Sequence, residues 1–491
     1  AVTGGSNTLT LSTGNNIANS DITASGAISG VTTLTLIDVG GTASFSSNVV
    51  VTTLTVGNTV NNVSLTGNGT VTNAVTFGND GTLTLGNASG DSFTFNGGLT
   101  VSTASSTLAG SIDSSNDDIT FGAITLATAT TLDTNASDTT GDIIIGAVTG
   151  ANNNLTLDTT TTTGSADITF NGDINLGTGA LSVTGDVVLG TNVTVTATQS
   201  SGTGIIFNDA INADDATNND RTLTIDAGTG SNVFVLGNVG ASQPLAGLTV
   251  TQSNGIGFFG SVDVTDSNSG TITLTDTQDN ILIIFGNVVA DSFVTAAQGY
   301  SLQIFGDATF ANAVTFQNTG TLLLGDATSD TFTFNGGVTE NTSGTVTIDG
   351  AIVSSDDAIT FGAISLGQDL SVTSAGGAIT IGAITSSSAR DVTITSSGGS
   401  TNTVTLSTLS GGNMNTIAVT GSTSVTLNGN ITTNNSSGNS VTITGTTINT
   451  GAITIDTNNS SNDGAINLVG SVASSNNNLA LDSGGAEITL S

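Results

Sequence analysis

The sequence predicts an all-β fold, a right-handed parallel β-helix (β-solenoid) with about 24 residues per coil. A long internal repeat is the first observation behind this prediction. The 26 residues from Asn73 to Gly98, NAVTFGNDGTLTLGNASGDSFTFNGG, recur from Asn312 to Gly337 with 19 identical positions. ITFGAITL at 119–126 then returns as ITFGAISL at 359–366, so the duplicated segments are 73–126 and 312–366.

A shorter period inside the chain is the second observation. ITFGAI, IIIGAV and ITFNGDI begin at Ile119, Ile143 and Ile168, which are 24 and 25 residues apart. A coil of this length holds three strands of roughly five residues with short turns between them, and coils of a solenoid stack at about 4.8 Å. The whole chain would then form about twenty coils.

The third observation is local patterning. Apolar residues alternate with Thr, Ser and Asn in runs such as NTLTLS, SFTFNG and AITID, and this period of two places one set of side chains on each face of a strand. Clusters such as NG, DG and GG separate the runs and supply turns. The chain has 65 Gly and one Pro and lacks most residues that helices prefer, so we expect strands and turns throughout.

The sequence fits two other all-β architectures less well. Propeller blades would need a period of about 40 residues, which the sequence does not show. An array of β-sandwiches is a weaker alternative, because no domain period near about 100 residues is visible.

Phenylalanine divides the chain into two expected regions. Residues 1–361 form a Phe-containing solenoid that includes the duplication, and residues 362–491 form a more polar continuation without Phe. Core filling is the expected role of Phe, and an exposed aromatic row that stacks on sugar rings is the alternative. Nine Phe lie within or at the end of apolar runs: Phe121, Phe170, Phe207, Phe234, Phe285, Phe305, Phe316, Phe334 and Phe361.

The charge is strongly one-sided. Asp and Glu number 37 against two basic residues, Arg221 and Arg390, which gives a formal net charge of -35. Nucleic acid and anionic membranes are therefore poor partners, since phosphate binding needs Lys and Arg. Divalent cations are better candidate partners, because Asp and Asn oxygens in Gly-rich turns are ligands that Ca²⁺ prefers.

The segment NADDATNND holds the leading calcium candidates, Asp214, Asp215, Asn218 and Asp220. It matches neither an EF-hand loop nor the nonapeptide GGxGxDxUx, and isolated solvated turns are the alternative interpretation. A second candidate comprises Asn116-Asp117-Asp118 and Asp356-Asp357, which occupy corresponding places in the two copies of the duplication. No other cofactor is expected.

Catalysis is not expected from this residue inventory. The chain has no His, Cys or Lys, which excludes a Ser-His-Asp triad, a thiol nucleophile and a Schiff base. Paired carboxylates such as Asp214 and Asp215 could in principle act as in glycosidases. The basic and aromatic residues that usually hold the sugar are scarce, so we predict a protein that is not an enzyme.

The sequence also bears on cellular location. The absence of Cys and of an initiator Met favours a processed, secreted bacterial chain that does not rely on disulfides. The longest apolar stretch, ILIIFGNVVA at 281–290, is too short to span a bilayer, so no membrane span is expected.

The repeats ITFGAITL, ITFNGDINLGTGALSVTGDVVL and GAITIDTNN resemble the β-strand repeats of filamentous-haemagglutinin-like adhesins and autotransporter passengers. This resemblance covers essentially the whole chain and implies a parallel β-solenoid at the bacterial surface. Such repeats are specific for the architecture and less so for the role, because they occur in adhesins, biofilm fibres and surface layers.

Two functions are therefore expected from different classes. In the first, the chain is an extracellular structural rod whose partner is itself, stacked head to tail or laterally into a fibre, sheath or biofilm filament. Its terminal segments AVTGGSNTLTLS and NNLALDSGGAEITLS are strand-like and carry no recognisable cap. In the second, the chain is the stalk or ligand-binding region of an adhesin, with cell-surface glycans as partners and contacts on an insertion at 210–220 or 238–245.

Overall fold

The computed structural model describes residues 1–14, 17–102, 105–134, 141–160, 166–215, 221–265, 269–276, 278–279, 282–342, 344–398, 402–410, 414–433, 440–458 and 463–491. These residues form two compact units, Ala1–Phe259 and Gly260–Ser491. They contain strands and turns and no helix, as the composition predicts. The change in composition after residue 361 falls inside the second unit.

The strands of the first unit are short and separated by turns. They are β1 (Val2–Leu11), β2 (Ile22–Ala24), β3 (Ile28–Leu36), β4 (Val39–Phe45), β5 (Val49–Val56), β6 (Val60–Leu65), β7 (Gly69–Val71), β8 (Val75–Phe77), β9 (Thr82–Leu85), β10 (Ser92–Phe95), β11 (Leu99–Val101), β12 (Ser105–Ser114), β13 (Ile119–Phe121), β14 (Ile124–Asp133), β15 (Ile143–Ile145), β16 (Val148–Thr149), β17 (Leu155–Asp158), β18 (Asp167–Phe170), β19 (Ile174–Asn175), β20 (Leu181–Thr184), β21 (Asp186–Leu189), β22 (Val193–Thr196), β23 (Thr203–Phe207), β24 (Ile211–Ala213), β25 (Thr222–Asp226), β26 (Asn232–Val235), β27 (Gly247–Gln252) and β28 (Ile256–Phe258).

The second unit is also built of strands separated by turns. Its strands are β29 (Val262–Val264), β30 (Thr271–Leu274), β31 (Leu282–Phe285), β32 (Val288–Ala290), β33 (Ser292–Thr295), β34 (Ser301–Ile304), β35 (Ala308–Phe310), β36 (Val314–Phe316), β37 (Leu322–Leu324), β38 (Thr331–Phe334), β39 (Val338–Glu340), β40 (Val346–Ser354), β41 (Ile359–Phe361), β42 (Ile364–Ser374), β43 (Ile379–Ile381), β44 (Ile384–Ser386), β45 (Arg390–Ser396), β46 (Thr403–Leu406), β47 (Met414–Leu427), β48 (Ile431–Thr432), β49 (Ser440–Thr450), β50 (Ile453–Asp456), β51 (Ala465–Ala473), β52 (Leu479–Asp482) and β53 (Ile488–Leu490).

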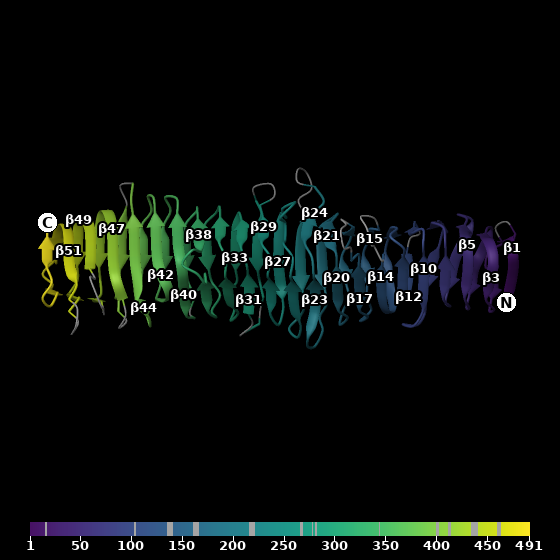
Figure 1. Cartoon of the computed structure of the whole chain (residues 1–491), viewed down its shortest axis with the longest axis horizontal. Helices are drawn as coiled ribbons and strands as arrows, with labels where there is room; N and C mark the ends of the chain where they lie inside the picture. The colour runs from purple at the N-terminus through teal and green to yellow at the C-terminus, as the bar shows by residue number, and fades with distance from the viewer. Residues whose placement is uncertain are drawn as a thin grey trace. The chain divides into compact units, whose positions relative to one another are not determined.

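In the first unit, strands pair in parallel with strands one turn away and build three faces. One face runs through β7, β10, β12, β14, β17, β20, β23, β26 and β28. A second runs through β8, β11, β13, β15, β18, β21 and β24. The third runs through β2, β4, β6, β9, β12, β14, β16, β19, β22, β25 and β27, where β12 and β14 bend round a corner and serve two faces. Figure 1 shows β10, β12 and β14 in this stacked order.

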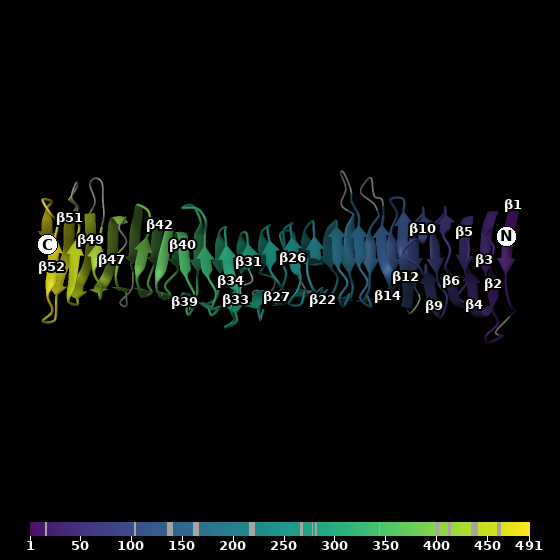
Figure 2. The ribbon, with the colours of Figure 1, turned by 90° about the horizontal axis from the view of Figure 1, so that it is seen from below.

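The second unit has the same three-faced construction. Its first face runs through β29, β32, β35, β38, β40, β42, β45, β47, β49, β51 and β53. Its second runs through β30, β33, β36, β39, β41, β43, β46, β47, β49 and the end of β51. The third includes β31, β34, β37, β40, β42 and β44. Figure 2 shows β31 beside β34 and β40 beside β42.

This arrangement confirms the predicted parallel β-solenoid. The three segments that define the short period lie in register, because Ile119 pairs with Ile143 and Ile143 pairs with Ile168. The two units together contain about 19 turns whose equivalent strands are about 23 residues apart, close to the expected 24. The period in the sequence is therefore one turn of the backbone.

Inward-facing apolar residues form the core in columns. Ile119, Ile143 and Ile168 all have 0% exposed area. Seven of the nine Phe singled out from the sequence are buried as expected, whereas Phe234 and Phe305 are half-buried. In the second unit Phe310 stacks on Phe334 with ring centroids 5.4 Å apart. Each fully buried side chain of this size contributes about 1.5–3 kcal/mol to the stability of the fold.

The duplication produces equivalent local structure in the two units. Phe93 and Phe95 on β10 face the core, and so do their counterparts Phe332 and Phe334 on β38. Each strand is followed by an Asn-Gly-Gly turn whose last Gly has a φ of 86° at Gly98 and 85° at Gly337. A Cβ at Gly337 would lie 2.6 Å from the carbonyl oxygen of Ala358 in the next turn. The turn therefore requires Gly both for its φ and for space.

Candidate functional site

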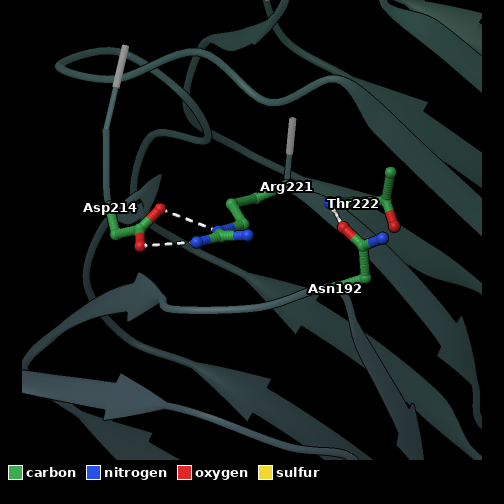
Figure 3. Close-up of polar contacts among 4 residues, drawn as sticks. All are labelled: Asn192, Asp214, Arg221 and Thr222. Carbon is green, nitrogen blue, oxygen red and sulfur yellow. Dashed lines mark hydrogen bonds and ion pairs between the residues drawn. The ribbon is translucent and has the colours of Figure 1, made fainter. Parts of the chain in front are cut away.

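The leading calcium candidates from the sequence are in the turn after β24. Figure 3 shows that both oxygens of Asp214 accept hydrogen bonds from the guanidinium of Arg221, from Nε and from Nη2, each at 2.8 Å. The backbone N–H of the neighbouring Thr222 donates to Oδ1 of Asn192 at 3.0 Å. A bidentate ion pair therefore occupies the carboxylate that the sequence predicts as a calcium ligand.

This pair also sets the proton affinity of its members. The hydrogen bonds from Arg221 hold the pKa of Asp214 below its usual range, and Asp214 in turn raises the pKa of Arg221. Asp215 lies next to the pair, whereas Asn218 and Asp220 fall outside the described residues. Within the described part of the chain, no group of three acidic side chains is arranged to hold a metal ion. Calcium binding here stays a prediction.

The second candidate from the sequence lines a groove in the first unit. The groove has a volume of about 360 Å³, and its walls include Thr76, Thr100, Gly97-Gly98 and Asn116-Asp117-Asp118. Two backbone bonds set its shape, since the N–H of Leu99 donates to the carbonyl of Asp118 at 2.9 Å and that of Val75 donates to Gly98 at 3.2 Å. Threonine hydroxyls and carboxylates on one wall can bind hydroxyl groups or a cation.

The same turn recurs in the second unit around Asp356 and Asp357. The hydroxyl of Ser354 donates to the carbonyl of Asp357 at 2.7 Å, as that of Ser114 does to Asp117. Duplication has therefore preserved the turn and one of its carboxylates, because Asp117 aligns with Asp357 whereas Asp118 aligns with Ala358. These contacts are local turn contacts, so they explain why the turn persists without requiring a ligand.

Several other acidic residues have a structural role that the sequence did not reveal. An oxygen of Asp or Asn in one turn accepts a hydrogen bond from a backbone N–H one turn later, as Asp118 does from Asp142 at 3.0 Å and Asp142 from Asp167 at 2.9 Å. We call this contact an inter-turn clamp. Further clamps join Asn62 to Thr82, Asp173 to Thr194, Asp186 to Ala210, Asn287 to Asp307, Asp307 to Thr331, Asp369 to Asp391, Asp391 to Thr416 and Asn430 to Thr454.

Clamps on consecutive turns stack like charges. Asp167 pairs in register with Asp186, and its backbone N–H is bound by Asp142. Partial burial and the charges of Asp142 and Asp186 raise the pKa of Asp167. The column of carboxylates is therefore a source of repulsion that protonation or a cation relieves.

A buried carboxylate in the second unit was also missed. Asp349 is 9% exposed, and the backbone N–H of Gly367 donates to its Oδ1 at 2.7 Å. Burial raises the pKa of Asp349, while the N–H groups of Gly367 and Gln368 and the charge of Arg390 act in the opposite direction. Alignment of the two copies places Ala109 at the equivalent position, so a comparison of the repeats could have revealed this substitution.

An exposed aromatic pair lies at the surface of the first unit. The ring of Phe259 is 53% exposed and stacks on Phe234 with centroids 6.3 Å apart and an interplanar angle of 28°. Leu236 beside them is 45% exposed. This pair is an exception to core filling, and it is smaller than the aromatic row considered from the sequence.

The outermost strands expose side chains of a kind that is buried elsewhere. Ile488 and Leu490 on β53 are 41% and 63% exposed, whereas their register partners one turn earlier, Ile466 and Leu468, are fully buried. In the first unit, Leu9 on β1 is only half-buried, although its partner Leu34 is 1% exposed. The apolar columns therefore reach solvent at the first turn of the first unit and at the last turn of the second unit.

Comparison of the chain with protein-family models, curated proteins and solved structures gives no match. The resemblance to filamentous-haemagglutinin-like adhesins and autotransporter passengers accordingly stays a prediction. Among the described residues, no helix is long and apolar enough to cross a membrane.

Proposed function

We propose that this chain is an extracellular structural protein without enzymatic activity, whose solenoid stacks end to end into a surface fibre, sheath or biofilm filament. The exposed ends of the apolar columns are the observation that carries this proposal. Ile488 and Leu490 continue columns that are buried in every preceding turn of their face from Ile417 and Val419 onward. One more turn placed on β53 would bury them.

The energetic gain from such stacking is substantial. Burying a fully exposed Leu or Ile side chain contributes about 1.5–3 kcal/mol. Ile488 and Leu490 are 41% and 63% exposed, so covering both contributes about 1.5–3 kcal/mol in total before any backbone pairing is counted. The outer edges of β1 and β53 also present backbone N–H and C=O groups to any strand at the same spacing of about 4.8 Å. A second copy of the solenoid, or a further segment of the same protein, would cover these apolar side chains and pair with these backbone groups.

Negative-stain electron microscopy of the purified chain tests this proposal. We expect filaments from the native sequence, and shorter filaments or none from variants with Lys or Pro within Thr8 to Ser12 or with Leu490→Lys. Thr249→Lys is the matched control, because it adds the same charge to an outward position of β27 away from the ends. Filaments of normal length from the end variants, with unchanged circular dichroism, would refute stacking through these strands.

The exposed aromatic pair supports a second candidate function, that of an adhesin stalk that binds cell-surface glycans. Exposed aromatic rings bind sugar rings by stacking, and Phe234 and Phe259 offer two adjacent rings. Glycan-array binding that is lost in Phe259→Ala and retained in Thr249→Lys would favour this role. Absence of binding in the native chain would leave the structural role alone.

A further inference from the structure

The second face of the second unit carries an uninterrupted row of uncharged side chains. Six consecutive turns place a Thr outward at the same position, since Thr315, Thr339, Thr360, Thr380, Thr405 and Thr426 are successive register partners. Thr273 and Val294 extend the row at one end and Asn449 at the other. We call these nine residues the threonine row.

Small residues border the row at two of its central strands. Ala358 and Ala378 immediately precede β41 and β43, and Gly362 and Gly382 immediately follow them. Phe361 on β41 and Phe316 on β36, another strand of the row, point inward with 2% and 0% exposed area. Small side chains at both borders let another flat surface approach the row closely.

Charge is distributed differently on the neighbouring face. The clamps from Asp307 to Thr331 and from Asp369 through Asp391 to Thr416 follow the border of the first face, where they form an acidic edge. No residue of the threonine row is ionisable. The nearest carboxylate along the chain is that of Glu340, which follows Thr339, is 9% exposed and accepts a hydrogen bond from the N–H of Gly362 at 2.9 Å. Asp291, Asp356 and Asp357 lie in the turns before β33 and β41. In a chain with a net charge of -35, an outward row without charge lets a like-charged body approach at a lower electrostatic cost than the acidic edge does.

From these observations we propose that the threonine row is a lateral packing face that binds the same face of a second copy. The two surfaces are uncharged and have the same repeat along the row, so methyl and hydroxyl groups of one copy can fit between those of the other over the whole length. A pair related by a two-fold axis gives each copy the same contacts. The inference rests on the proposed fibre, because it adds sideways contacts to an end-to-end stack.

The size of the face determines when such packing occurs. The row spans eight steps of about 4.8 Å, and each strand is about 10 Å long. The face therefore covers about 400 Å² per copy. A stable protein interface buries about 800 Å² per partner, so two isolated chains bind each other only weakly. In a filament the same contact repeats with every copy, and the contacts act together. Lateral pairing therefore follows filament formation.

Cysteine cross-linking tests the packing face independently of stacking, because the native chain has no Cys. Thr380→Cys places a thiol on the exposed centre of the row, and Thr393→Cys places one on an equally exposed position of β45 beside the acidic edge. With a short bismaleimide linker at high ionic strength, which screens repulsion, we expect several-fold more cross-linked dimer from Thr380→Cys. Equal yields from the two variants would overturn the proposal.

Filament width provides the second readout. Native filaments should be at least two solenoids wide, and Thr360→Lys with Thr380→Lys should give filaments of normal length and single width. Thr393→Lys is the control and should leave the width unchanged. Native filaments of single width would refute lateral packing while end-to-end stacking stands, whereas a lack of filaments would refute stacking and leave the cross-linking result to decide on the face.

Discussion

At the scale of single residues, two buried asparagines show how the core tolerates polar groups. Asn79 and Asn318 occupy equivalent positions in the duplication and are 2% and 0% exposed. Nδ2 of Asn318 donates to the carbonyls of Tyr300 and Thr321 at 3.3 and 3.2 Å, and Nδ2 of Asn79 makes the matching pair of bonds. Each amide therefore satisfies two backbone carbonyls, while its own oxygen lacks a partner among the described residues.

We predict that Asn318→Leu destabilises the chain, although it removes an unsatisfied oxygen. The carbonyls of Tyr300 and Thr321 each lose one donor, although that of Thr321 still accepts the N–H of Leu302 at 2.9 Å. The loss costs about 1–3 kcal/mol. Urea denaturation followed by circular dichroism measures the change. Asn312→Ala, at an exposed position, is the control and should change stability by less than about 0.5 kcal/mol. An Asn318→Leu protein as stable as the native one would show that the carbonyls find other donors.

At the scale of strands and turns, the inter-turn clamps give several acidic residues a structural role. A carboxylate that accepts a hydrogen bond from a backbone N–H one turn later satisfies a donor that has no ladder partner where a strand ends and a turn begins. The same geometry stacks charges of one sign, as Asp142, Asp167 and Asp186 show. Each clamp therefore combines a favourable hydrogen bond with an unfavourable repulsion, and the balance depends on pH.

We predict that Asp167→Asn stabilises the chain at pH 7. Because the pKa of Asp167 is raised in the folded state, the stability present below the ordinary carboxyl pKa is lost as the pH rises through the raised value. Removing one charge of the column should raise stability by about 0.2–1 kcal/mol at pH 7. The gain should vanish near pH 3, where the native carboxyl is protonated.

Thermal unfolding at the two pH values measures this difference. Asp80→Asn is the matched control, since Asp80 is exposed and lies apart from the column. The same stabilisation at both pH values would show that the substitution acts through packing and not through charge.

At the scale of the whole molecule, the net charge of -35 and the open end strands act in opposite directions. Repulsion between carboxylates favours separate, extended chains, whereas the exposed apolar columns favour stacking. Salt and divalent cations weaken the repulsion between carboxylates and leave the apolar attraction between end turns unchanged. Assembly should therefore depend strongly on the ionic medium.

Calcium should stabilise the folded chain through Asp-rich turns. A cation that binds only the folded form raises its melting temperature and relieves repulsion between carboxylates. Asp214→Asn with Asp215→Asn should reduce this effect if the turn after β24 takes part. The measurement is the melting temperature with millimolar Ca²⁺ at constant ionic strength, and an unchanged value in the native chain would contradict the prediction.

The architecture was predictable because it depends on local and periodic properties. Alternation at period two requires strands, and the recurrence of ITFGAI, IIIGAV and ITFNGDI sets the length of a turn. Burial of Phe93, Phe95, Phe332 and Phe334 follows from the same alternation. These properties are repeated many times along the chain, so the prediction did not depend on any single residue.

The sequence by itself thus determined a parallel solenoid of alternating strands, its period and most of its core. Only the tertiary structure decided what each polar residue does, because that depends on which residue lies one turn away. Arg221 takes Asp214 into an ion pair across a turn, and Asp167 meets Asp142 and Asp186 only after the turns have stacked. Turn lengths differ between neighbouring coils, so vertical neighbours cannot be found by counting a fixed number of residues. The threonine row and the exposed end columns are likewise properties of the stack, since each is made of residues that are far apart in the chain and aligned by backbone pairing.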